Sequence, residues 1–510
     1  MKAIIIGSGL SGLTAAAYLA KMGCEVTVFE QNSDIGGVTA GLKRDGYSWD
    51  LGQLILEGFG PGEQAGYILE DLGIMADLKT NRADRSYVFP EITIQPPEKY
   101  RGPWWRKDFF LSHFPNERKG IEKYYRMYVR FMELVTAARR AERSSGLRSI
   151  FYKLRLYATL LPFLPRISWN AKRMIEHLFK ERSLQEVFIS ILADFVVKPS
   201  QFPGLGIPAV NPEPAFDRRV PLEVSKSGLQ PSYRYIEGGI RPLVDAMARL
   251  IERNGGRILT GQEIKRIECE RGIVRGVLTA SGVAHTADII VASGGAREAF
   301  FDLVGREQLP SKFIKRLESM RLMESILMVQ LGIDFDPRPH QKEAVVYYYR
   351  TSDIERSVDD VQSGRYHEGR DGFLIYVGTY YTPSMAPAGH HAVTIYTIAP
   401  NTLAGDSWEK RKDEMADKLL ELAEEVIPGL RAHARAKIII TPDDWRRITH
   451  QRHHAFGGCA PVMGTKGAPH RTPIKGLYFV GAQSESGAGL NNVLEGSWRA
   501  ARFVRKDFKL

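Results

Sequence analysis

The chain has 510 residues, 44% of them hydrophobic and 25% charged, which is the composition of a globular protein large enough for several domains. Its net charge of +11 favours anionic partners such as phosphorylated ligands, nucleic acid or a membrane surface. Three scattered cysteines without a CxxC pair argue against a disulfide framework and a zinc site. No apolar run approaches the roughly 18 residues of a membrane span.

The first thirty residues predict a strand, a glycine-rich turn, a helix and a second strand that ends on an acid. Residues 2–6 form the first strand, Gly7-Ser8-Gly9-Leu10-Ser11-Gly12 follows, and residues 25–29 lead into Glu30. In such a unit the glycines permit a tight turn, a close approach to a pyrophosphate and close helix packing. The helix N-terminus favours phosphate, and the acid can accept hydrogen bonds from ribose hydroxyls. The stretch therefore predicts a dinucleotide site. Because the first apolar run is already a strand, we expect no secretory signal and a cytoplasmic protein.

A second glycine-rich turn follows directly. Residues 31–38 contain the pair Gly36-Gly37, and residues 41–50 predict a hairpin arm that closes at Gln53. The backbone of this turn can approach an extended cofactor a second time, although a solvated loop is the alternative.

This combination resembles the FAD-binding oxidoreductases of the phytoene desaturase type, which include carotenoid desaturases, carotenoid isomerases and retinol saturases and share a fold with the amine oxidases. The resemblance implies bound FAD. Many relatives carry Arg directly after the Gly pair, where this chain has Val38.

From about residue 99 to 192 the sequence is aromatic, basic and mostly helical in pattern. Residues 148–161 predict an amphipathic helix, followed by an apolar Pro-rich turn at 160–165. The apolar face is expected to comprise Ile150, Phe151, Leu154, Tyr157 and Leu161, opposite Arg148, Tyr152, Arg155 and Thr159. Such a helix can lie in an anionic membrane interface, which predicts peripheral membrane association. The alternative is a helical lid packed on the core with a solvated basic face. No nucleic-acid-binding motif accompanies the charge, so we expect no nucleic-acid partner.

A Pro- and Gly-rich connection at 199–235 leads to a helix at 242–254 and strands at 257–260, 263–268, 273–279 and 287–292. In the resembled family this unit completes the FAD domain, which implies an adenine contact at Glu263-Ile264 and a cofactor-side position for Gly294. Arg241 is expected to be a structural or cofactor-side contact.

Residues 306–440 predict a second sheet with covering helices, including a helix at 408–426. The last forty residues repeat a strand, a glycine-rich turn and a helix. The strand at 476–481 is followed by Ala482. The glycine-rich turn at 486–490 includes Gly489 and Leu490, and the helix is expected at 491–504. Its free N–H groups are expected to face the flavin or the pyrophosphate.

The sequence contains no Ser/His/Asp or metal-ligand constellation. His450, His453 and His454 precede the closing unit, and Glu485 lies in the turn beside the expected flavin. We take His453 and Glu485 as candidate catalytic acid/base residues, with a structural role as the alternative. The residues expected to bind FAD are Gly7, Ser8, Gly9, Leu10, Ser11, Gly12, Glu30, Gln31, Gly36, Gly37, Val38, Ile264, Gly294, Gly481, Ala482, Gly489, Leu490 and Asn491.

The expected fold is α/β, a Rossmann-like FAD-binding domain of the amine-oxidase type with an inserted mixed-sheet and helical substrate domain. We expect residues 1–95, 235–305 and 440–510 to form the FAD domain, 96–234 a basic helical region, and 306–439 the mixed substrate domain.

The resemblance implies an FAD-dependent oxidoreductase that desaturates or saturates carbon–carbon bonds of a lipophilic isoprenoid or polyene. The alternatives are a redox-neutral cis–trans isomerase, an amine oxidase, and a lipid-binding escort protein such as the GDP dissociation inhibitors. The sequence does not fix the oligomeric state.

Overall fold

The computed structural model describes residues 1–52 and 54–510; the predicted end of the hairpin arm at Gln53 lies outside them. Its first sheet has five parallel strands in the order β12-β2-β1-β16-β22. They are β12 (Arg257–Leu259), β2 (Glu25–Phe29), β1 (Lys2–Ile6), β16 (Ile289–Ala292) and β22 (Leu477–Phe479). Three distant segments therefore build one sheet, and its inner strands are short apolar runs because both faces are covered.

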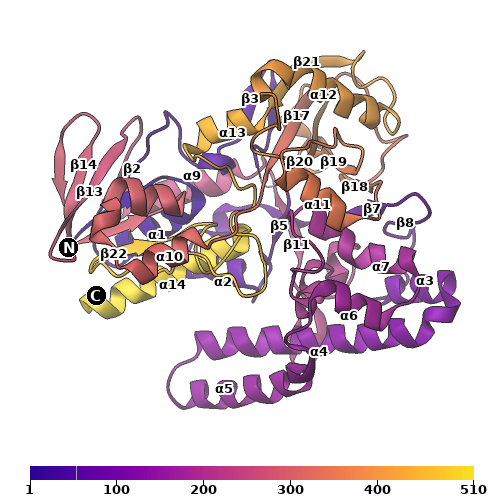
Figure 1. Ribbon diagram of the computed structural model, residues 1–510, viewed down its shortest axis with the longest axis horizontal. Helices are drawn as coiled ribbons and strands as arrows, with labels where there is room; N and C mark the ends of the chain where they lie inside the picture. Colours follow the sequence, from indigo (N-terminus) through magenta and orange to yellow (C-terminus); the bar gives the residue numbers. More distant parts are fainter. Residues whose placement is uncertain (53) are drawn as a thin grey trace.

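Helices cover one face of this sheet and a meander covers the other (Figure 1). On the first face α1 (Leu10–Lys21) packs against α9 (Arg241–Arg253) and α14 (Leu490–Phe508), and α14 packs on α2 (Gln64–Leu72). The small side chains of residues 15–17 are fully buried and let α1 lie close to its neighbours. The meander on the other face consists of β13 (Ile264–Glu270), β14 (Ile273–Thr279) and β15 (Ala284–Thr286), with α10 (Ser311–Glu318) nearby.

The second sheet has seven strands in the order β21-β17-β20-β19-β18-β7-β8. They are β21 (Ala434–Ile440), β17 (Ser325–Ile333), β20 (His391–Ala399), β19 (Gly372–Val377), β18 (Val345–Tyr349), β7 (Ser86–Val88) and β8 (Thr93–Ile94). We expected residues 86–94 in the FAD domain, but β7 pairs in parallel with β18 and extends the second sheet. The covering helices are α11 (Ile354–Gln362), α12 (Trp408–Glu424) and α13 (Pro442–Thr449).

The region predicted to be helical, 96–234, is helical up to residue 215 and lies at the lower right of Figure 1, whereas its last part forms short strands. Its helices are α3 (Trp105–His113), α4 (Arg118–Arg143), α5 (Gly146–Leu160), α6 (Ala171–Leu178), α7 (Arg182–Ile189) and α8 (Ile207–Val210). Its core is rich in aromatic rings and encloses an ion pair between Arg106 and Glu213, 3.0 Å apart, in which neither side chain is exposed. The remaining short strands are β3 (Leu42–Arg44), β4 (Tyr47–Trp49), β5 (Leu56–Glu57), β6 (Thr80–Arg82), β9 (Glu223–Ser225), β10 (Gly228–Leu229) and β11 (Tyr233–Ile236).

Helix α5 runs beside α4 (Figure 1), and most of its large apolar side chains are exposed. Phe151 and Leu154 are 61% and 65% exposed, whereas Tyr152, Arg155 and Thr159 on the other face are half-buried. Three of the four residues expected on the second face thus lie on the half-buried side of the helix, but Arg148 is exposed. The alternative of a lid that packs its apolar face on the core is wrong, because that face is exposed. No helix in the described part of the chain is both long enough and apolar enough to cross a membrane.

Candidate FAD-binding site

A cavity of about 1540 Å³ begins at the glycine-rich turn after β1 and continues to the second sheet and the helical region. It is larger than the roughly 300–1,000 Å³ of a typical small-ligand pocket. Sixteen of the eighteen residues predicted to bind FAD line it: Gly7, Gly9, Leu10, Ser11, Glu30, Gln31, Gly36, Gly37, Val38, Ile264, Gly294, Gly481, Ala482, Gly489, Leu490 and Asn491. The other two, Ser8 and Gly12, lie behind its wall.

The three glycines of the first turn have three different roles. Gly7 has a φ of +92°, which side-chain-bearing residues rarely adopt. A Cβ on Gly12 would lie 2.1 Å from the carbonyl oxygen of Gly7, so Gly12 is needed for helix packing and does not contact the cavity. A Cβ on Gly9 would meet no protein atom within 4 Å, because it would project into open space at the N-terminus of α1. Gly9 thus leaves room for a group that is not protein.

Ser8 positions Glu30 instead of lining the cavity. Its backbone N–H and its hydroxyl donate to the same carboxylate oxygen of Glu30, at 2.8 and 2.6 Å. The other carboxylate oxygen accepts from the backbone N–H of Asn32 at 2.8 Å. Glu30 is only 5% exposed but still borders the cavity, so its remaining lone pairs can accept from ribose hydroxyls. The side chain of Ser8, predicted to contact the cofactor, points to Glu30 and is fully buried.

The second glycine-rich turn lies against the first. The N–H of Gly36 donates to the carbonyl oxygen of Ser8 at 3.0 Å, and Gly36 and Gly37 both have positive φ. Val38 lines the cavity next to them. Arg241 does not replace the missing arginine, because it forms ion pairs with Asp34 and Asp245 at 2.6 and 2.8 Å; of its two expected roles, the structural one is confirmed.

The closing unit completes the cavity wall from the other end of the chain. Gly489, with a φ of +91°, caps the N-terminus of α14, and a Cβ there would project into open space. The helix begins at Leu490, so its first free N–H groups border the cavity. The side chain of Asn491 is directed elsewhere, since its Oδ1 accepts from the N–H of Ala65 at 3.0 Å.

These features fit a dinucleotide cofactor with an anionic centre. Two helix N-termini without side-chain caps, α1 and α14, border one cavity, and glycines leave open space at both. Helix N-termini and backbone N–H groups bind phosphate, and the carboxylate of Glu30 suits a ribose. Ile264 and Gly294, from the meander and the end of β16, form the adjoining wall.

A family model described as flavin containing amine oxidoreductase matches residues 10–505. The chain belongs to this family. It is an FAD-dependent oxidoreductase, and the residues described above are those that would hold FAD.

Relatives of this flavoprotein span nearly its whole length. It is 23% identical to pyridine nucleotide-disulfide oxidoreductase domain-containing protein 2 of Rattus norvegicus, over 99% of this chain and 94% of the relative. It is 26% identical to the chloroplastic prolycopene isomerase of Daucus carota, over 100% and 80%. It is 24% identical to a 4,4'-diapophytoene desaturase of Methylomonas sp, over 99% and 96%. An oxidoreductase structure from Methanosarcina mazei covers 98% of the chain with a TM-score of 0.65 at 20% identity, which shows the shared fold.

The histidines before the closing unit lie in different surroundings. His453 does not border the FAD cavity, since its Nε2 lies 2.8 Å from the carbonyl oxygen of Met323 and 3.1 Å from Nδ2 of Asn401. His454 does border it and stacks on Trp445, with ring centroids 5.0 Å apart. Burial, with the nearby His453 and Arg446, lowers the pKa of His454 to about 3. The structure therefore turns His453, the expected acid/base, away from the cavity and keeps His454 neutral.

Glu485 lies at the cavity wall as expected. Its two carboxylate oxygens accept from the N–H of His470 at 3.1 Å and from Arg316 at 3.2 Å. Both contacts hold the turn before α14, and a catalytic role for Glu485 stays a prediction. Within residues 1–52 and 54–510, no group of three His, Cys, Asp or Glu side chains is placed to hold a metal ion.

The sequence reasoning missed charged residues in the part of the cavity away from the glycine-rich turns. Arg85 and Asp194 border it there, together with Tyr347 and Tyr396. They come from four distant segments, and none belongs to a recognisable motif. The only sequence feature that could have indicated this part of the cavity was the run of tyrosines at 347–349.

Proposed function

We propose that this flavoprotein oxidises or reduces carbon–carbon bonds of a lipophilic isoprenoid or polyene. The observation that carries the proposal is the continuation of the FAD cavity into a chamber lined largely by aromatic and aliphatic side chains. The chamber lies between the second sheet and the helical region and includes Phe195, Phe202, Leu374, Tyr396 and Phe456. An extended apolar molecule would be stabilised there by burial, at roughly 25 cal/mol per Å².

The relatives support the same substrate class. A 4,4'-diapophytoene desaturase and a prolycopene isomerase, by their names, act on carotenoids, and the chain covers most of both. In the proposed reaction, bound FAD supplies the hydride acceptor or donor at N5. The protein's own contribution is to orient the substrate along the chamber and to exclude water from the reacting carbons.

A redox-neutral cis–trans isomerase is the second candidate, favoured by the similarity to the Daucus carota isomerase. The two candidates differ in electron balance. Purified protein is loaded with FAD, and one sample is kept oxidised while a second is reduced with dithionite. Both are incubated anaerobically with a polyene, and the flavin absorbance at about 450 nm is followed while products are separated. Loss of the absorbance in the oxidised sample with one more double bond in the product, or its recovery in the reduced sample with one fewer, supports the oxidoreductase. A changed double-bond geometry in the reduced sample without any change in absorbance supports the isomerase. Peroxide release with amines and no reaction with any polyene would overturn both.

We also propose that the protein docks on anionic membranes through the surface formed by α5 and the following turn, called here the α5 surface. Its exposed apolar side chains are Leu147, Ile150, Phe151, Leu154, Tyr157, Leu161, Leu164 and Ile167. They are the majority of the large hydrophobic side chains exposed in the described part of the chain. Large exposed apolar patches mark interaction sites.

The charges around the α5 surface support an anionic lipid surface as its partner. Exposed basic side chains lie among and beside the apolar ones, at Arg148, Lys153, Arg166, Lys172 and Arg173. Lys and Arg near an apolar face each add about 1 kcal/mol of attraction to anionic lipid. The surface is connected to the FAD-binding part through α4, which packs on α5 and whose Glu142 pairs with Arg499 of α14 at 2.6 Å. A lipophilic substrate would thereby be taken up next to the bilayer that dissolves it.

A further inference from the structure

The chamber beyond the FAD-binding residues carries buried charge, which a hydrocarbon cannot satisfy. Arg85 is 4% exposed and borders the cavity. Its guanidinium carbon lies 5.0 Å from the ring centroid of Tyr233, 5.1 Å from that of Phe216 and 5.9 Å from that of Tyr347. Its Nη2 donates to the carbonyl oxygen of Val210 at 2.7 Å. This arrangement fixes a cation in an otherwise aromatic wall.

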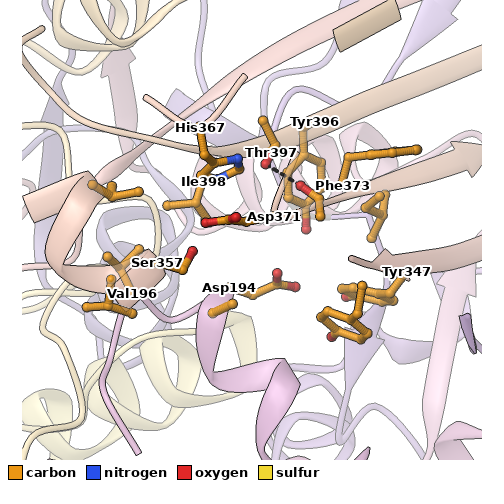
Figure 2. A pocket seen from close by; sticks show the side chains of 16 residues that line it. Asp194, Val196, Tyr347, Ser357, His367, Asp371, Phe373, Tyr396, Thr397 and Ile398 are labelled. Atoms are coloured by element: carbon orange, nitrogen blue, oxygen red, sulfur yellow. Dashed lines mark hydrogen bonds between the residues drawn. The ribbon is translucent and has the colours of Figure 1, made fainter. Parts of the chain in front are cut away.

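The carboxyl group of Asp194 faces the same chamber and accepts no hydrogen bond from the described residues. Figure 2 shows its side chain pointing into a small cavity opposite Tyr347, with His367 and Asp371 on the other side. Asp194, Tyr347 and Tyr396 border both this small cavity and the large one. Among the residues that the structure describes, no group donates a hydrogen bond to the Asp194 carboxyl. Burial raises its pKa to about 7, and the charge of Arg85 opposes that rise.

The other ionisable groups at this wall balance the charge. Glu57 and Arg139 also border the large cavity, so two cations face two carboxyls. Burial raises the pKa of Glu57, and the charges of Arg139 and Arg85 only partly oppose this rise. When both carboxyls are ionised, which for Asp194 requires a pH above about 7, the wall has no net charge to attract an ionised ligand end. Burying an unpaired polar group costs on the order of 1–3 kcal/mol, so a ligand that leaves Arg85 and Asp194 unsatisfied is disfavoured.

We propose that the substrate carries an uncharged oxygen group, a hydroxyl or carbonyl, which binds between Arg85 and Asp194 and beside Tyr347. A hydroxyl oxygen accepts from Arg85, and its hydrogen is donated to the Asp194 carboxylate. A carbonyl oxygen accepts from Arg85 and from the protonated form of Asp194. This inference rests on the proposed function and narrows it, because it excludes an unsubstituted hydrocarbon as the preferred ligand.

Three C20 probes of one branched skeleton test the proposal: phytane, phytanol and phytanic acid. Their binding to the FAD-loaded protein is measured from the change in the flavin spectrum, without turnover. We expect phytanol to bind about tenfold more tightly than phytane, which corresponds to about 1.4 kcal/mol. Arg85→Met and Asp194→Asn should each remove most of this preference, by weakening phytanol binding and by leaving the Kd of phytane unchanged or lower, since one buried charge fewer is then left unsatisfied.

Asp50→Asn is the matched control. Asp50 is also a buried aspartate whose pKa burial raises to about 7, but it does not border the cavity and accepts instead from the N–H of Ile240. This variant should keep the preference for phytanol. Equal binding of phytane and phytanol, tighter binding of phytanic acid, or an unchanged preference in Arg85→Met would each overturn the proposal.

A failure of the proposed function is separable from a failure of this inference. If no polyene is transformed but phytanol is still preferred, the proposed function fails and the polar recognition site stands. If none of the three probes perturbs the flavin, the chamber does not accept lipophilic ligands and both are overturned.

Discussion

Ser8 donates two hydrogen bonds to a single carboxylate oxygen of Glu30, from its backbone N–H at 2.8 Å and its hydroxyl at 2.6 Å. The first glycine-rich turn is thereby joined to the end of β2. The carboxyl that is to receive the ribose is held in place before any cofactor binds, which lowers the ordering cost of binding.

Ser8→Ala should weaken FAD binding without unfolding the protein. One donor to the Glu30 carboxylate is lost, and a hydrogen bond to a charged group contributes about 1.5–3 kcal/mol. We expect the Kd of FAD, measured by the recovery of flavin fluorescence, to rise about tenfold or more. An unchanged Kd together with an unchanged melting temperature would show that the Ser8 hydroxyl does not orient Glu30.

Gly9→Ala and Gly12→Ala form a pair with opposite expected results. A methyl group on Gly9 meets no protein atom within 4 Å, so the cofactor-free protein should melt as the wild type does but bind FAD weakly. A methyl group on Gly12 would lie 2.1 Å from the Gly7 carbonyl oxygen, so stability should fall by about 1–3 kcal/mol even without FAD. Thermal melting of the two cofactor-free proteins and their FAD affinities distinguish the roles. Equal stability losses would contradict the assignment.

Arg106→Met should strongly destabilise the helical region. Arg106 and Glu213 form a fully buried ion pair, and removing one partner leaves an unpaired charge, at a cost of about 3–5 kcal/mol. The double variant Arg106→Met with Glu213→Gln should recover part of the loss, because no ionised group then remains. Denaturant unfolding of the three proteins measures this, and a double variant less stable than Arg106→Met would count against the reasoning.

His454 should make the fold sensitive to acid. Its pKa is lowered from an ordinary 6.5 to about 3 by burial, so between these values the unfolded chain binds the proton and the folded chain does not. The stability that this group contributes is complete above pH 6.5 and is lost as the pH falls towards 3. The melting temperature of the wild type should therefore fall more steeply between pH 6.5 and 4.5 than that of His454→Gln. Parallel curves would refute the assignment.

The α5 surface predicts binding to anionic vesicles. Phe151→Glu with Leu154→Glu places two charges on exposed apolar positions, so folding and FAD content should be unchanged. Cosedimentation with phosphatidylglycerol–phosphatidylcholine vesicles should fall about tenfold or more, given roughly 1.5–3 kcal/mol per buried large side chain. Val283→Glu, at an exposed position between β14 and β15 and outside the α5 surface, is the control. Concentration-dependent dimers of the wild type that the double variant abolishes, without vesicle binding, would assign the surface to a second copy of the chain.

By itself the sequence determined the FAD-binding part, because binding of the cofactor there depends on backbone conformation and on room left by missing side chains. Positive φ at Gly7, open space at Gly9 and the acid at Glu30 are local requirements that a short motif records. Only the tertiary structure decided what lies around the cofactor. It turned His453 away from the cavity, directed Ser8 to Glu30 and exposed the apolar face of α5. It also brought Arg85 and Asp194 from distant segments to one chamber, and contacts between such segments leave no local pattern to read.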